Sequence, residues 1–107
     1  MTTRKTRRIT IELTKAILDL SRSGWMRSAI AQRNIKWLVA HELGACKRHI
    51  GILCNRDGTT VCHGIERAKQ LLKSSDCFVV HHYKTVRSDA EYIVRRMASD
   101  EGNDEAT

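Results

Sequence analysis

Proline is absent from the 107 residues, and only 5% of them are aromatic. Because strands are enriched in aromatic and β-branched residues, whereas proline disrupts helix interiors, this composition favours helices. No run approaches the ~20 apolar residues of a membrane-spanning helix, and the amino terminus lacks the apolar segment of a secretory signal peptide. We therefore expect an all-α, cytoplasmic protein with no membrane partner, in which the four cysteines stay reduced.

Motifs that carry catalysis are also missing. The sequence contains no phosphate-binding loop, no nucleophile elbow and no paired metal carboxylates. Cys62 and His63 are neighbours on a predicted helix and face different directions, so they do not form a nucleophile pair. The cysteines and histidines lack the paired spacing of zinc sites, and the adjacent His81 and His82 would point about 100° apart on a helix. The sequence therefore predicts neither an enzyme nor a metal or other cofactor.

Basic and acidic residues are unevenly distributed. The net charge is +7, and four of the twelve acidic residues lie within 99–107, which leaves 19 basic and 8 acidic residues in the remainder. A body this basic indicates a polyanionic partner, with solubility alone as the alternative. Residues 1–8 predict a flexible basic arm, either an inert tail or a minor-groove contact, and 99–107 predict a disordered acidic tail. The basic residues of the arm are Arg4, Lys5, Arg7 and Arg8.

Apolar residues recur at helical spacing through most of 9–98, which we interpret as one domain. Thr10 and Ser28 are suited to cap the first two helices, because their hydroxyls accept hydrogen bonds from free backbone N–H groups. Glycines that follow the apolar stripes mark the ends of the same two helices. The predicted helices run from Thr10 to Ser23–Gly24, from Ala29 to Leu43, from about Lys47 to Cys54 and from about Thr59 to Lys73.

The segment 76–98 has two local signals. Phe78-Val79-Val80 is typical of a strand, but the longer apolar pattern from Val79 to Met97 has 4-3-4-3-4 spacing and favours one long amphipathic helix. Such a helix either covers the core or pairs with another chain. In the second case the protein is a helical oligomerisation or adaptor module with a self-partner or a regulatory protein, and DNA binding is secondary or lost.

Residues 50–72 are the most informative part of the sequence. An apolar stretch ends at Cys54, a tight polar turn follows, and Thr59 and Thr60 then open a helix with a strong apolar stripe. This is the layout of a helix-turn-helix, here over 47–73, in which the second helix presents its first turn to DNA base edges. The alternative is that the threonines simply begin the helix, with Asp57 as another possible cap.

Two blocks of sequence resemble the C-terminal DNA-binding domain of the bacterial replication initiator DnaA. The first is Arg33-Asn34-Ile35 through Ala40-His41-Glu42-Leu43, and the second is Ile50-Gly51 followed by Arg56-Asp57-x-Thr59-Thr60-Val61-x-His63. The resemblance extends from near Ile11 through the last long helix. It implies a small helical domain with a Trp-repressor-like helix-turn-helix. Because the phosphate-binding loop is absent, it implies the DNA-reading module without the ATPase.

The resemblance also implies which residues meet DNA. Asp57, Thr59 and Thr60 are expected to face bases in the major groove, where hydroxyls and carboxylates meet base edges. Phosphate contacts are expected from Arg33, Arg56, His63 and Arg67. The partner would be double-stranded DNA with some sequence preference, and the role would be regulation of transcription or replication at the nucleoid.

The sequence departs from the family in three places. Gly58 stands where the family has a histidine, so one base-reading side chain is missing, worth ~1–3 kcal/mol of discrimination. Residues 22–27 are less basic than the family's minor-groove loop, and the arm of residues 1–8 is the expected substitute. Gly64 lies inside the predicted recognition helix at a cost of ~1 kcal/mol relative to alanine. It predicts a close backbone approach, either to DNA or to a neighbouring helix.

Overall fold

The computed structural model describes residues 9–20, 29–74 and 76–106, with side chains described as far as Arg96. The predicted basic arm of residues 1–8 and the Ser28 cap lie outside these residues. The described secondary structure is entirely helical, without a strand in these ranges, so the prediction of an all-α fold is confirmed. None of the described helices has the length and hydropathy needed to cross a membrane. The helices are α1 (Ile11–Leu18), α2 (Ala29–Glu42), α3 (Lys47–Cys54), α4 (Gly58–Lys73) and α5 (Cys77–Ala106).

Local signals in the sequence fix several helix ends. The Thr10 side chain accepts a hydrogen bond from the Leu13 N–H at 3.1 Å and caps α1, as predicted. Gly44 has a φ of 115° and follows the end of α2, also as predicted. The predicted end of α1 at Ser23–Gly24 is wrong, because the helix already ends at Leu18. There the Leu20 N–H bonds to the Ile17 carbonyl, three residues earlier, which tightens the last turn.

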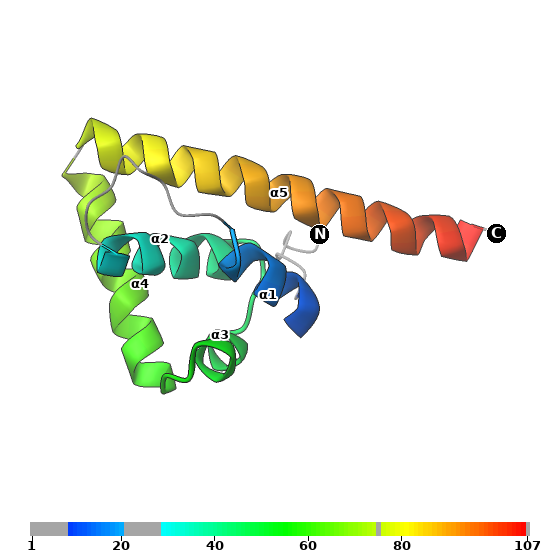
Figure 1. Cartoon of the computed structure of the whole chain (residues 1–107), viewed down its shortest axis with the longest axis horizontal. Helices are drawn as coiled ribbons and strands as arrows, with labels where there is room; N and C mark the ends of the chain where they lie inside the picture. The colour runs from blue at the N-terminus through cyan, green and yellow to red at the C-terminus, as the bar shows by residue number, and fades with distance from the viewer. Residues whose placement is uncertain (1–8, 21–28, 75, 107) are drawn as a thin grey trace, which may run out of the picture.

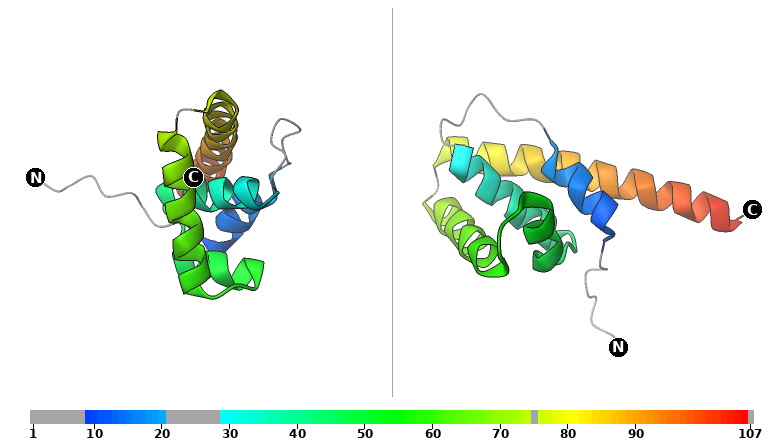
Figure 2. Two further views of the ribbon diagram at one scale, coloured as in Figure 1. Left: turned by 90° about the vertical axis from the view of Figure 1, so that its left-hand side faces the viewer. Right: turned by 60° about the horizontal axis from the view of Figure 1, so that its bottom comes forward.

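Helix α2 lies at the centre of the molecule and separates two layers (Figure 1). It packs against α4 on one side and α5 on another, and α1 contacts α2, α3 and α5. Helix α5 therefore lies across one side of the α1–α2 pair, and the connection between α3 and α4 lies on the opposite side, as both further views agree (Figure 2). The core between them is built from large side chains with almost no exposure, namely Ile17, Ile35, Trp37, Leu38, Ile50 and Ile65.

Helix α5 covers the core with one side. Val79, Val86 and Ala90 are buried there, and Tyr83 and Ile93 pack beside them. The periodic apolar stripe of α5 therefore packs on the core of its own chain, which is the first of its two interpretations. Helix α5 continues to Ala106, through most of the segment whose composition predicts a disordered tail, and projects beyond the other helices (Figure 2). Extending an existing helix adds a hydrogen bond for each residue without a new nucleation step, and no proline interrupts it.

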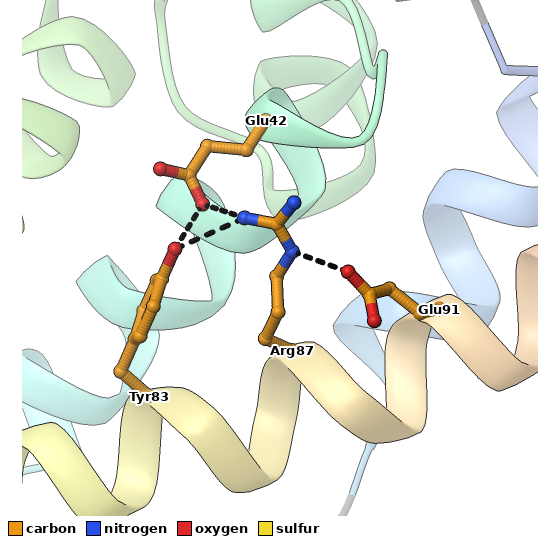
Figure 3. Close-up of polar contacts among 4 residues, drawn as sticks. All are labelled: Glu42, Tyr83, Arg87 and Glu91. Atoms are coloured by element: carbon orange, nitrogen blue, oxygen red, sulfur yellow. Dashed lines mark hydrogen bonds and ion pairs between the residues drawn. The ribbon is translucent and has the colours of Figure 1, made fainter.

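A polar network ties α5 to the carboxyl end of α2 (Figure 3). The Tyr83 hydroxyl donates to Glu42 Oε1 at 2.5 Å, and Arg87 Nη1 donates to the same oxygen at 2.7 Å. Arg87 Nε also donates to Glu91 at 3.0 Å. Burial, followed by the hydrogen bond to Glu42, raises the pKa of Tyr83, so the phenol stays protonated and keeps donating. The network fixes the position of α5 along α2.

Candidate nucleic-acid interface

A tight turn joins α3 to α4. Asn55 adopts the left-handed conformation, with φ 57° and ψ 47°, which asparagine reaches more readily than most residues. The Arg56 N–H then donates to the Gly51 carbonyl at 2.8 Å and closes the turn. A Cβ atom at Gly51 would lie only 2.6 Å from the Arg56 carbonyl oxygen. The turn therefore requires glycine one helical turn before it, which explains the Ile50-Gly51 pair.

Asp57 caps the amino end of α4. Its Oδ1 accepts a hydrogen bond from the Thr60 N–H at 2.8 Å, and α4 begins at Gly58. This backbone hydrogen bond is the main reason that the pKa of Asp57 is lowered, so the cap is ionised at neutral pH. Thr59 and Thr60 are the second and third helical residues rather than the cap. Thr59 is exposed and Thr60 is half-buried, so Thr59 is the more accessible of the two.

The space in front of this helix end is open. A Cβ atom built on Gly58 would meet no atom within 4 Å. Arg48 and Arg56 are both exposed, and they line a shallow hollow together with Gly58 and the exposed Ile52. Arg48 was not among the predicted contacts. Its signal in the sequence is that it lies one turn before Ile52, on the side of α3 opposite the buried Ile50.

Arg33 lies against the core rather than reaching freely into solvent. Its guanidinium stacks on the Trp37 ring, 4.2 Å from the centroid, and donates to Asn34 Oδ1 from Nε at 3.2 Å and from Nη2 at 3.0 Å. Burial lowers the pKa of Arg33, and the positive charge of Arg56 lowers it further. The two arginines therefore act on each other electrostatically, and Arg33 stands beside the α3–α4 turn.

Gly64 lies at the contact between α2 and α4. A Cβ atom there would lie 2.5 Å and 2.6 Å from two atoms of the Trp37 ring, and 2.7 Å from Asn34 Oδ1. The close backbone approach predicted for this glycine is therefore made to a neighbouring helix. The Trp37 indole N–H also donates to Cys54 Sγ at 3.4 Å, which fixes the end of α3. One buried tryptophan thus positions both helices that flank the turn.

The other predicted contacts lie further along α4. His63 is exposed one turn after Thr59, close enough to Asp57 for their charges to interact. Arg67 is exposed and borders a groove between α2 and α4. Glu66 is exposed near them and pairs with Lys69 at 3.4 Å. The turn therefore brings together Arg56, Asp57, Thr59, Thr60 and His63, with Arg33 and Arg67 at the sides; Arg4, Lys5, Arg7 and Arg8 lie outside the described residues.

The cysteines are free thiols in this structure. Lys47 Nζ lies 3.6 Å from Cys62 Sγ, a contact that links the start of α3 to α4. Within residues 9–20, 29–74 and 76–96, no three side chains of histidine, cysteine, aspartate or glutamate are arranged to hold a metal ion.

No protein-family model, curated protein or solved structure matches this chain. The resemblance to the DnaA domain therefore depends on the two sequence blocks quoted above.

Proposed function

We propose that this protein binds double-stranded DNA through the α3–α4 surface, which we define as Arg48, Ile52, Arg56, Thr59 and His63. The observation that carries the proposal is the open space at Gly58, in a hollow that is also lined by two exposed arginines. In a helix-turn-helix the amino end of the second helix enters the major groove. A first turn made of glycine and threonine allows that approach, because no bulky side chain holds the helix off the groove floor.

The charges around the helix end suit a polyanion. Arg48 and Arg56 both line the hollow, where they would contact phosphates that border a groove. The helix dipole adds a partial positive charge at the start of α4, which the ionised Asp57 cap offsets in part. Arg33, His63 and Arg67 extend the positive surface to the side. We expect the arm residues Arg4, Lys5, Arg7 and Arg8 to follow the backbone into the minor groove.

Base recognition would come mainly from Thr59 and Thr60, whose hydroxyl and methyl groups suit base edges in the major groove. Asp57 has a mixed role in this proposal. One carboxylate oxygen caps α4, and the other oxygen accepts from a cytosine amino group. The proposal describes a regulator of transcription or replication at the nucleoid in the cytoplasm, which acts by binding and not by catalysis.

Glu66 limits how much of α4 meets DNA. Its carboxylate is exposed about two turns beyond Thr59, and a phosphate placed there would be repelled. The neighbouring Lys69 offsets part of this repulsion. Contact is therefore concentrated at the first turns of the helix, where the described side chains are short or basic.

The test compares two double variants with the same change in net charge. Arg48→Gln/Arg56→Gln removes two cations from the α3–α4 surface, and Lys15→Gln/Lys73→Gln removes two exposed cations from α1 and the far end of α4. Duplex affinity is measured by fluorescence anisotropy over a range of salt concentrations. Each lost phosphate contact should reduce the slope of log affinity against log salt by about 0.9, so the first variant loses about 2 and the control stays near wild type. Equal effects in the two variants, or a wild-type affinity that is insensitive to salt, would contradict the proposal.

A further inference from the structure

The side of α5 that faces away from the core has its own pattern of side chains. Successive residues of a helix are ~100° apart, and on this spacing seven exposed polar side chains of α5 fall within about 60° of one line along the helix. Within 77–96, the part of α5 whose side chains are described, the two carboxylates of Asp89 and Glu91 fall about 80° to either side of that line, and Glu91 is engaged by Arg87. We call the following set the outer α5 stripe, all of it exposed: His81, Lys84, Thr85, Ser88, Tyr92, Arg95 and Arg96.

The outer α5 stripe lies on the opposite side of the molecule from the α3–α4 surface. The buried residues Val79, Val86 and Ala90 face α1 and α2, so the stripe points away from both helices. Figure 1 shows α5 along one edge of the molecule and the α3–α4 connection at the other edge, with α2 between them. A partner bound at one surface therefore leaves the other surface accessible.

The chemistry of the stripe matches the backbone of nucleic acid. Lysine, arginine and the hydroxyls of serine, threonine and tyrosine are the side chains that most often contact DNA phosphates and sugars. Arg96 Nη1 donates to the Tyr92 hydroxyl at 3.0 Å, which holds that guanidinium along the stripe. The stripe runs for ~21 Å from His81 to Arg95 along the middle of a helix, not at its amino end. It is therefore suited to backbone contact and not to reading bases in a groove.

We propose that the outer α5 stripe binds the sugar-phosphate backbone of a second DNA duplex while the α3–α4 surface holds the first. One chain would then bridge two duplexes. This inference rests on the proposed function, because it assumes that the first duplex is bound at the α3–α4 surface. Charge complementarity supports the inference. Within about 60° of its central line, the stripe offers cations and hydroxyls to a duplex that carries one negative charge per ~1.7 Å of axis.

The experiment measures the two binding events separately. An unlabelled duplex is fixed to beads, the protein is bound and excess is washed away, and a fluorescent second duplex is then added at low salt. Lys84→Gln/Arg95→Gln removes two cations from the stripe, and Lys15→Gln/Lys73→Gln is the matched control. We expect the stripe variant to be retained on the first duplex like wild type and to capture about tenfold less of the second. The control should capture the second duplex normally, and circular dichroism should show every variant folded.

Three results would overturn the inference, and they differ from failure of the proposed function. Retention of wild-type protein on the first duplex without capture of the second would exclude bridging and leave the proposed function intact. Capture that persists in the stripe variant would assign bridging to another surface or to a second copy of the chain. Loss of retention on the first duplex in the stripe variant would place α5 in the primary contact. If wild-type protein is not retained by any duplex, the proposed function itself fails and bridging fails with it.

Discussion

Helix α4 contains two glycines with opposite surroundings. Gly58, at its amino end, faces open space, whereas Gly64, six residues later, lies against the Trp37 ring so closely that a single added carbon would overlap it. The first glycine leaves a helix end accessible, and the second allows two helices to touch. The comparison shows that the residue type alone does not reveal which surface is free for a partner.

The buried contact at Gly64 and the exposed helix end at Gly58 are structurally linked. Trp37 packs on Gly64 and also donates to Cys54 at the end of α3, so the buried contact sets where the exposed turn lies. A helix end that is to enter a DNA groove must be held firmly from behind. The buried half of α4 therefore serves as the support for its exposed half, and substitutions in the two halves should have separable effects.

The largest effect is expected from Gly64→Ala. The added methyl group would overlap Trp37 and Asn34, and overpacking of this kind costs ~1–3 kcal/mol. The gain in helix propensity is ~1 kcal/mol. The cost exceeds this gain because the buried Trp37 ring has little room to shift. We expect a net loss of unfolding free energy, measured by urea denaturation. Gly58→Ala is the control and should be neutral or slightly stabilising. Unchanged stability of Gly64→Ala with weakened DNA binding would instead mean that this glycine faces DNA.

Gly58→His tests the exposed half of α4. Because a Cβ atom at this exposed position meets no protein atom within 4 Å, we expect the variant to fold normally and to place an imidazole over the groove. We expect the sequences selected from a random duplex pool to change, with ~1–3 kcal/mol of new discrimination at one base pair, toward the sites of the initiator family that the chain resembles. An unchanged selection, with Gly58→Ala measured in parallel, would show that the turn does not lie over bases.

A third prediction concerns a buried histidine on the α5 side of the core. His82 is 1% exposed, and neither of its ring nitrogens has a hydrogen-bond partner. Burial lowers the pKa of His82, and the charges of Lys36 and His81 lower it further, so the folded chain favours the neutral ring. Its contribution to stability is complete above the unfolded pKa of about 6.5 and declines as the pH falls from there toward the folded pKa.

We therefore expect the free energy of unfolding, measured by urea denaturation, to decrease as the pH is lowered from about 7.5 to about 5.5, by up to ~1.4 kcal/mol for each unit of difference between the two pKa values. The variant His82→Leu should show a smaller pH dependence than wild type, whereas His81→Gln should retain most of it, because burial is the larger cause of the lowered pKa of His82. Equal pH dependence in all three proteins would mean that the ring of His82 is not held neutral by its surroundings.

The smallest effect is expected from Glu66→Gln. Removing the exposed carboxylate from α4 should raise duplex affinity about two- to threefold at low salt, since exposed charge interactions are worth ~0.2–1 kcal/mol. Glu12→Gln, which removes an exposed carboxylate from α1, is the control and should change affinity less. Reduced affinity in Glu66→Gln would place the contact surface elsewhere than the first turns of α4.

Much of the fold near the turn was predictable because its signals are local. The α3 bounds agree with the sequence prediction, and α4 begins one residue before its predicted start, because Asp57 is the cap. Contacts between distant segments were not predictable. The stacking of Arg33 on Trp37 and the choice of α2 as the neighbour of Gly64 both depend on how helices pack in three dimensions. The continuation of α5 to Ala106 was missed because composition indicates polarity but not helix propagation.

The most direct test of DNA docking is amide chemical-shift mapping of labelled protein titrated with duplex. The Lys84→Gln/Arg95→Gln background is used, so that the outer α5 stripe contributes little to the signal. The account predicts that the largest shifts fall at Arg48 and along 55–63, with the amides of Gly58 and Thr59 among them. Shifts confined to α1 or α5, or no shifts at a salt concentration where nonspecific binding is measurable, would contradict it.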